Sequence, residues 1–176
     1  IEFCRKNKIP FLGLCYGLQL AVVEFARHTA GLKGAHTTEV NPKTKYPVID
    51  TLPEQIVNIK ERKMGGSMRL GAYTCEIKPA TVAFHAYGGK LVTERHRHRY
   101  EVNNDFREQL EKKGLMVSGI NPERNLVEII ELKGHPFFVG TQFHPELKSR
   151  PLRPHPLFRE FLRVSIVKSA RHRGFK

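Results

Sequence analysis

The sequence predicts an α/β domain in which a buried strand leads directly into a helix, and two observations support this. Residues 11–14 form a short apolar run after Pro10, and this is the length of a strand buried on both faces. From Gly17 the apolar side chains recur at helical spacing until about Gly31. Three more strand-like runs follow late in the chain, at 115–120, 126–132 and 137–143.

The first half of the chain is divided by breaks in this pattern. Residues 1–7 have the composition of the end of an amphipathic helix. The stretch from about 33 to 53 has many turn-forming residues and little periodicity, so we expect a long surface connection. After Gly65-Gly66, strand segments are predicted at 68–70 and 72–77.

Glycine and proline also divide the second half. Residues 90–102 alternate as a strand does, and residues 104–113 have helical composition that a glycine ends. Pro145 stops the last predicted strand. A proline-rich connection then leads to an amphipathic helix at 157–167 and to a basic end, 168–176.

Length and composition indicate a single domain and disfavour membrane-spanning and nucleic-acid-binding proteins. The 176 residues suit one domain. No apolar run reaches the roughly eighteen residues of a membrane span, so we expect no membrane association. Lys and Arg total 30 against 17 for Asp and Glu, and the net charge of +13 favours anionic partners. Nucleic acid is nevertheless disfavoured, because no zinc-finger, helix-turn-helix, RNP or Gly-rich phosphate-loop pattern is present.

The cysteines indicate the compartment. Cys4, Cys15 and Cys75 are too few and too irregularly spaced for a disulfide framework or a zinc ribbon. We therefore expect a reducing, cytoplasmic location. The chain starts at Ile1 rather than Met and has no signal-peptide pattern, so we expect it to be a piece of a longer protein.

Cys15 stands in a sequence that is typical of a nucleophile elbow. In Gly13-Leu14-Cys15-Tyr16-Gly17 the two glycines permit a tight turn from strand to helix, which pushes the middle side chain outward. The helix N-terminus would favour a thiolate, and the Tyr16 N–H would donate to an oxyanion. The alternative is that Cys15 is a small buried side chain in an ordinary turn.

A thiol nucleophile needs a base and a group that orients the base, and His144-Pro145-Glu146 offers both at a strand end. Loops at the carboxyl ends of different strands meet in one crevice of an α/β sheet, so a long separation from Cys15 is no obstacle. Alone, this tripeptide would more often be a turn. Together with the elbow it favours catalysis.

Residues 95–100 alternate arginine with histidine or tyrosine. In a strand, Arg95, Arg97 and Arg99 share one face, and His96, His98 and Tyr100 share the other. The arginines would hold a carboxylate or phosphate, or else they form a solvated edge strand. The two histidines lack a third ligand at convincing spacing, so we expect no metal site.

These motifs resemble the class I (triad) glutamine amidotransferases and, within them, the C-terminal glutaminase domains of CTP synthases. The resemblance covers about residues 9–162. It implies a three-layer, flavodoxin-like α/β fold that is incomplete at its N-terminal side, with an amidotransferase domain over 1–165 and a basic tail over 166–176. The strings that carry it are Gly13–Gln19, Gly66–Gly71, Glu94–Asn103, Leu126–Glu131 and Gly140–Glu146.

The resemblance implies a triad in which Cys15 attacks the side-chain amide of glutamine, His144 acts as general base and acid, and Glu146 orients it. Ammonia leaves, and water hydrolyses the thioester to glutamate. Carried over by motif, the glutamine-binding residues would be Tyr16, Gly17, Leu18, Gln19, Glu39 and Arg99. No cofactor or metal is expected in this segment.

In the family the ammonia is used by a separate synthetase domain, which binds UTP, ATP and Mg and responds to GTP in a homotetramer. Two substitutions depart from the family pattern, at Tyr16 and Leu147. The family's upstream glycine-rich loop, which supplies a second oxyanion donor, has no counterpart here, so we expect weak or absent activity of this chain alone. Two alternatives stay open: another class I amidotransferase, and a non-catalytic fragment that binds a partner.

Overall fold

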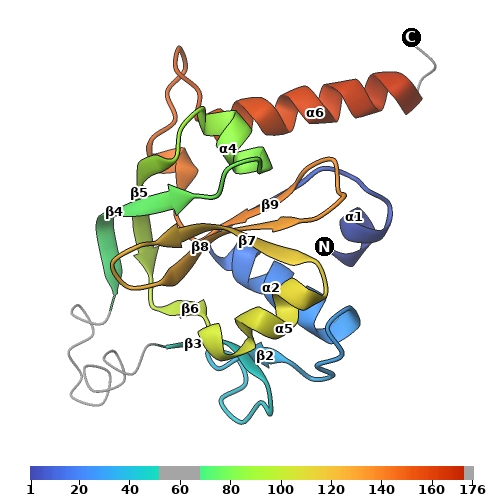
Figure 1. The fold of residues 1–176 in the computed structure, drawn as a ribbon, viewed down its shortest axis with the longest axis vertical. Coiled ribbons are helices and arrows are strands. Elements are labelled where there is room, and N and C mark those ends of the chain that lie inside the picture. Colours follow the sequence, from blue (N-terminus) through green and yellow to red (C-terminus); the bar gives the residue numbers. More distant parts are fainter. Residues whose placement is uncertain (52–67, 173–176) are drawn as a thin grey trace.

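The computed structural model describes residues 1–51 and 68–172, and these form a three-layer arrangement around a mixed sheet (Figure 1). The predicted pair of Gly65-Gly66 lies outside the described residues. The elements in chain order are α1 (Glu2–Lys6), β1 (Phe11–Leu14), α2 (Tyr16–His28), β2 (His36–Thr37), β3 (Pro47–Thr51), β4 (Arg69–Ile77), α4 (Val82–Tyr87), β5 (Leu91–His98), β6 (Tyr100–Val102), η1 (Asn104–Phe106), α5 (Arg107–Lys112), β7 (Leu115–Asn121), β8 (Leu126–Leu132), β9 (Phe138–Thr141), η2 (Pro145–Leu147) and α6 (Pro156–His172).

The main sheet has the strand order β1-β9-β8-β7-β4-β5. Its pair β1–β9 is parallel, whereas the other neighbours in the order are antiparallel. The predicted α/β class and the three late strands are confirmed. The parallel pair brings the carboxyl ends of β1 and β9 together, which is where Cys15 and His144 follow.

The stretch from 33 to 53 is not the simple surface connection that we predicted. It contains β2 and β3, which form a second sheet with β6. Val48 and Ile49 on β3 are fully buried. These strands escaped prediction because their sequence lacks alternation: consecutive apolar residues are both buried, so no period of two marks them.

The alternating segment 90–102 is divided between the two sheets. Over β5 the prediction is confirmed, because Arg95 and Arg97 are exposed and His96 and His98 are buried. At Arg99 the chain bends out of the main sheet, and β6 pairs with β3 instead. The alternation of faces therefore ends at Arg99, and Arg99 and Tyr100 are both half-buried.

The helices form the outer layers. α2 and α5 pack on one face of the main sheet with the second sheet, and α4 and α6 pack on the other (Figure 1). Helix α4 had no periodic signal, because it is a single short segment. Its N-terminus is capped from a distance: both carboxylate oxygens of Glu131 accept hydrogen bonds from the N–H groups of Val82 and Ala83, at 2.8 and 2.9 Å.

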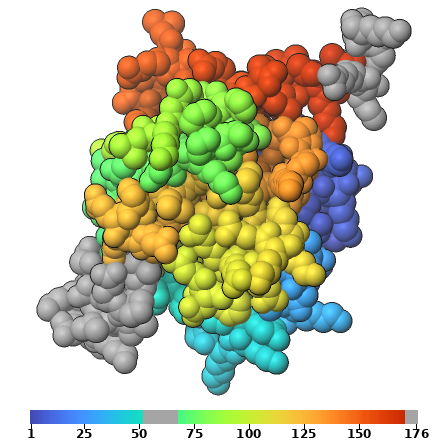
Figure 2. Space-filling view, in the orientation of Figure 1, coloured from blue at the N-terminus to red at the C-terminus, as the bar shows by residue number. Residues whose placement is uncertain are grey.

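Helix α6 begins close to its predicted start but continues past 167 through most of the predicted basic end, to His172. In the space-filling view it stands out from the body of the molecule (Figure 2). Its first turns pack on α4, and Leu157 is fully buried. None of the helices in the described part of the chain is long and apolar enough to cross a membrane.

A pair of glycines lets α2 approach the sheet. Gly13 on β1 is the register partner of Gly140 on β9. A Cβ on Gly13 would lie 2.8 Å from the backbone of Gly17, and a Cβ on Gly140 would lie 3.2 Å from the Leu18 Cα. The first turn of α2 therefore rests directly on the backbone of two paired strands: a Cβ at Gly13 would collide with it, and a Cβ at Gly140 would be tight against it.

This close approach predicts opposite effects of one extra methyl group at two glycines of the elbow. Gly13→Ala should lower the free energy of unfolding by about 1–3 kcal/mol, because backbone atoms must shift. Gly17→Ala is the matched control and should raise the free energy of unfolding. Its Cβ meets nothing within 4 Å, and alanine favours a helix over glycine by about 1 kcal/mol. Urea unfolding of both variants tests this, and equal or reversed midpoints would contradict it.

Candidate active site

Cys15 occupies the sharp turn that the elbow motif predicts, between the end of β1 and the start of α2. Its backbone has φ 49° and ψ −100°, a conformation that costs energy for a residue with a Cβ. The Cys15 N–H donates to the Thr141 carbonyl at the end of β9, at 2.7 Å. The turn is thus held by the strand that leads to His144.

The sulfur of Cys15 is partly enclosed. The Gln142 side-chain amide donates to it at 3.8 Å, and the Tyr16 N–H also points to it. Burial nevertheless raises the pKa of the thiol to about 11, and the carboxylates of Glu101 and Glu146 act in the same direction. The Tyr16 N–H at the helix N-terminus favours the thiolate, in the predicted direction, but burial outweighs it and the free site holds a thiol.

His144 and Glu146 form the hydrogen bond that the motif predicts. The Nδ1–H of His144 donates to Glu146 Oε1 at 2.6 Å, and the His144 backbone N–H donates to the Arg95 carbonyl at 2.8 Å. The carboxylate thereby fixes the tautomer in which Nε2 carries the lone pair. Nε2 is buried and has no hydrogen-bond partner among the described residues, so it is available to accept a proton.

A cavity of about 510 Å³ opens beside Cys15. Of the predicted glutamine-binding residues, Tyr16, Gln19, Glu39 and Arg99 line it. Gly17 and Leu18 do not: the Leu18 side chain is fully buried in the core, and Gly17 is in the turn of α2 that faces Gly13. The first turn of α2 points the Leu18 side chain into the sheet, so a contact of Gly17 or Leu18 with glutamine through the backbone stays a prediction.

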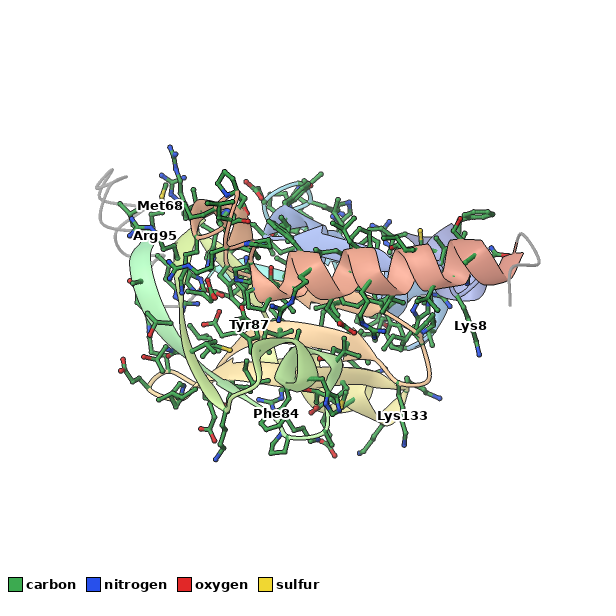
Figure 3. The ribbon with its side chains drawn as sticks, turned by 90° about the horizontal axis from the view of Figure 1, so that it is seen from above. Lys8, Met68, Phe84, Tyr87, Arg95 and Lys133 are labelled. Carbon is green, nitrogen blue, oxygen red and sulfur yellow. The ribbon has the colours of Figure 1, made fainter. Side chains whose placement is uncertain are left out.

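Other lining residues lie outside the predicted glutamine-binding set. Met68 and Val40 add apolar surface, and Arg97, His98 and Tyr100 come from the end of β5 and the bend that follows. Met68 lies at the same end of the molecule as Arg95 and far from Lys8 (Figure 3). The alternating pattern predicted His98 and Tyr100 on the face opposite the arginines. The bend at Arg99 is what brings both kinds of side chain to one cavity.

A buried ionic cluster lies next to this cavity. Arg69 is 1% exposed and contacts Glu128 at 2.6 Å and Glu101 at 3.2 Å. His96 Nδ1 and His98 Nε2 hydrogen-bond at 3.0 Å, and burial lowers their pKa values to about 2 and 3. Both buried rings are thus neutral at physiological pH.

One group of potential metal ligands lies elsewhere in the described residues: Glu2, Glu24 and His28. Glu2 pairs with Lys6 at 2.5 Å and Glu24 with Arg5 at 2.7 Å. Because lysine and arginine already neutralise these carboxylates, we assign no metal to them.

Known proteins resemble the chain along most of its length. A family model described as "Glutamine amidotransferase class-I" matches residues 1–164. The CTP synthase of Caldanaerobacter subterraneus subsp. tengcongensis is 60% identical over 166 residues, which are 94% of this chain and 30% of the relative. The CTP synthase of Bacillus subtilis is 54% identical over 165 residues, again 94% and 30%. The chain thus spans about 30% of the length of these relatives.

Solved structures agree with this relationship. The glutaminase domain of Trypanosoma brucei CTPS with bound acivicin superposes with a TM-score of 0.86 and 34% identity, over 94% of this chain and 63% of that one. A putative GMP synthase component from Thermoplasma acidophilum is 16% identical, with a TM-score of 0.60 over 98% of this chain and 65% of that one, and this is a likeness of fold alone. The match over residues 1–164 is decisive: this chain belongs to the class I glutamine amidotransferases.

Proposed function

We propose that this chain carries the glutaminase half-reaction of a CTP synthase, in which glutamine is hydrolysed to glutamate and ammonia. The observation that carries the proposal is the elbow thiol of Cys15, which adjoins a cavity containing both Glu39 and Arg99 and is tied to the strand end that bears His144 and Glu146. The similarity to CTP synthases supports amination of UTP as the use of the ammonia.

Glutamine bears an ammonium and a carboxylate on one carbon. Glu39 and Arg99 line the same cavity and carry the complementary charges, so Glu39 would accept from the ammonium and Arg99 would donate to the carboxylate. Held in this way, the side-chain amide of the substrate reaches toward Cys15. Gln19 and Tyr100 line the same cavity between α2 and β6.

The reaction begins with a protonated thiol. Nε2 of His144 takes the proton from Cys15 as the sulfur attacks the amide carbon, and Glu146 stabilises the imidazolium that forms. The Tyr16 N–H donates to the oxyanion. His144 then protonates the leaving nitrogen, ammonia departs and a thioester remains. Water, deprotonated by His144, attacks the thioester and releases glutamate and the thiol.

The remaining steps belong to the longer protein. We propose that ATP and Mg activate UTP on a separate synthetase domain, that GTP acts as effector, and that the longer protein is a homotetramer. We further propose that the amidotransferase unit spans 1–165 and that 166–176 is a basic tail, although α6 crosses this boundary without a break.

The glutamine site is tested by labelling this chain with a glutamine-mimicking diazoketone. Intact-mass spectrometry should show a single adduct that excess glutamine suppresses and that Cys15→Ala abolishes. Arg99→Met should reduce the labelling rate by about tenfold or more, because a charged hydrogen bond to the carboxylate is lost. Arg163→Met, in an exposed pair with Glu160 on α6, is the matched control and should label normally. An adduct that persists in Cys15→Ala would refute the assignment.

The use of the ammonia is tested in a full-length synthase that carries this segment. With UTP and ATP, Cys15→Ala should abolish CTP formation from glutamine but leave CTP formation from added ammonium salt intact, because only the thiol chemistry is lost. Loss of both activities in a folded variant, or loss of neither, would contradict a separate glutaminase step. An acceptor other than UTP would indicate a different class I amidotransferase.

The raised pKa of Cys15 predicts how its labelling by iodoacetamide depends on pH. With a pKa of about 11, the thiolate fraction should rise about tenfold per pH unit from pH 7 to 10, without the levelling above about pH 9.5 that an ordinary thiol shows. Peptide mass mapping separates Cys15 from Cys4, and Cys15→Ser gives the background. A labelling rate that levels off by about pH 9.5 would show that burial does not control the thiol.

A further inference from the structure

Gln142 is a buried side chain that no step above uses. It follows β9 directly, is 0% exposed, and does not line the glutamine cavity. Its backbone N–H donates to the Glu128 carbonyl at 2.8 Å, which anchors it to β8. Its side-chain Nε2 is 3.8 Å from the Cys15 sulfur. Gln142 therefore touches the nucleophile from the protein side rather than from the substrate side.

The direction of the Gln142 amide follows from its other contact. Gln19 Nε2 donates to the Tyr100 carbonyl at 2.9 Å and to Gln142 Oε1 at 3.3 Å. A backbone carbonyl only accepts, so the Gln19 nitrogen must face Tyr100, and the Gln142 atom beside that nitrogen must be the oxygen. The Gln142 NH₂ group is left to face the sulfur. Gln19 thus donates both to Tyr100 and to Gln142, and Gln142 donates to Cys15.

This contact changes in strength with the state of the sulfur. A neutral thiol accepts an N–H weakly, whereas a thiolate accepts it as a charge-assisted hydrogen bond. The side-chain amide of Gln142 and the N–H of Tyr16 favour the thiolate; the carboxylates of Glu101 on β6 and of Glu146 in η2 oppose it. Gln142 is accordingly a buried side-chain donor to the Cys15 sulfur. It stands two residues before His144, the base that must remove the thiol proton.

We propose that Gln142 is a positioning residue that orients the Cys15 sulfur and stabilises its thiolate, and that it joins the nucleophile to the glutamine cavity through Gln19. The proposal rests on the proposed function, because it takes Cys15 as the nucleophile. It assigns Gln142 no contact with substrate. Its action is on the sulfur alone, before and after glutamine is bound.

The test is the pH profile of iodoacetamide labelling at Cys15, measured by peptide mass mapping without glutamine. Gln142→Met keeps the volume and removes the donor, and it should lower the Cys15 labelling rate at pH 8 by about tenfold. The near-isosteric Gln142→Glu places a carboxylate at the sulfur and should lower it further, with the profile shifted to higher pH. Labelling of Cys4 in the same samples should be unchanged, which reports that the fold is intact.

Gln109→Met is the matched control, since the Gln109 amide donates to the Ala30 carbonyl at 3.0 Å, away from the site. In this variant, iodoacetamide should label Cys15 at the same rate as in the unmodified chain. Normal Cys15 profiles in folded Gln142→Met and Gln142→Glu would overturn the proposal. If Gln142→Met does not fold, the labelling profile of Cys15 in Gln142→Glu alone decides between the two outcomes. Failure of the proposed function looks different: the diazoketone would then not label Cys15 in the unmodified chain, whatever the iodoacetamide profile.

Discussion

The site depends on how closely helix α2 approaches the parallel pair β1–β9. Gly13 and Gly140 are partners in that pair; a Cβ on Gly13 would collide with the first turn of the helix, and a Cβ on Gly140 would be tight against it. The close approach forces a sharp turn at Cys15, whose positive φ is retained because the Cys15 N–H is bonded to Thr141. A looser packing of α2 would relax that turn and move the thiol away from the end of β9.

The electrostatics of the site keep the nucleophile protonated at rest. One guanidinium, Arg69, lies between two buried carboxylates, and burial outweighs its attraction enough to raise the pKa of Glu101 to about 8 and that of Glu128 to about 7. Burial likewise raises the pKa of the Cys15 thiol, to about 11. The thiolate must form together with proton transfer to His144, which ties the appearance of the reactive species to the attack itself.

Local chemistry could be predicted from the sequence, and long-range geometry could not. The elbow and the His144–Glu146 hydrogen bond follow from residues within five positions of one another, so their patterns were sufficient. Motif transfer names Leu18 but does not say which face of α2 is buried, and the Leu18 side chain lies in the core. The bend at Arg99 and the cap of α4 by Glu131 depend on strands distant in sequence, and no local period reports such contacts. Gln142 stands within the Gly140–Glu146 motif, but its contact with Cys15 could not be predicted, because the two residues lie 127 positions apart.

Register in the β1–β9 pair is what makes these separate segments one site. A slip of one residue would reverse every side chain of β1 relative to β9 and would replace a glycine by a larger residue beneath α2. Two contacts oppose such a slip. The rings of Phe11 and Phe138 stack at 4.5 Å at one end of the pair, and the glycine partners admit α2 near the other. Because Cys15 and Gln142 each follow their strand directly, the same register that satisfies the core also sets the distance between the nucleophile and its buried donor.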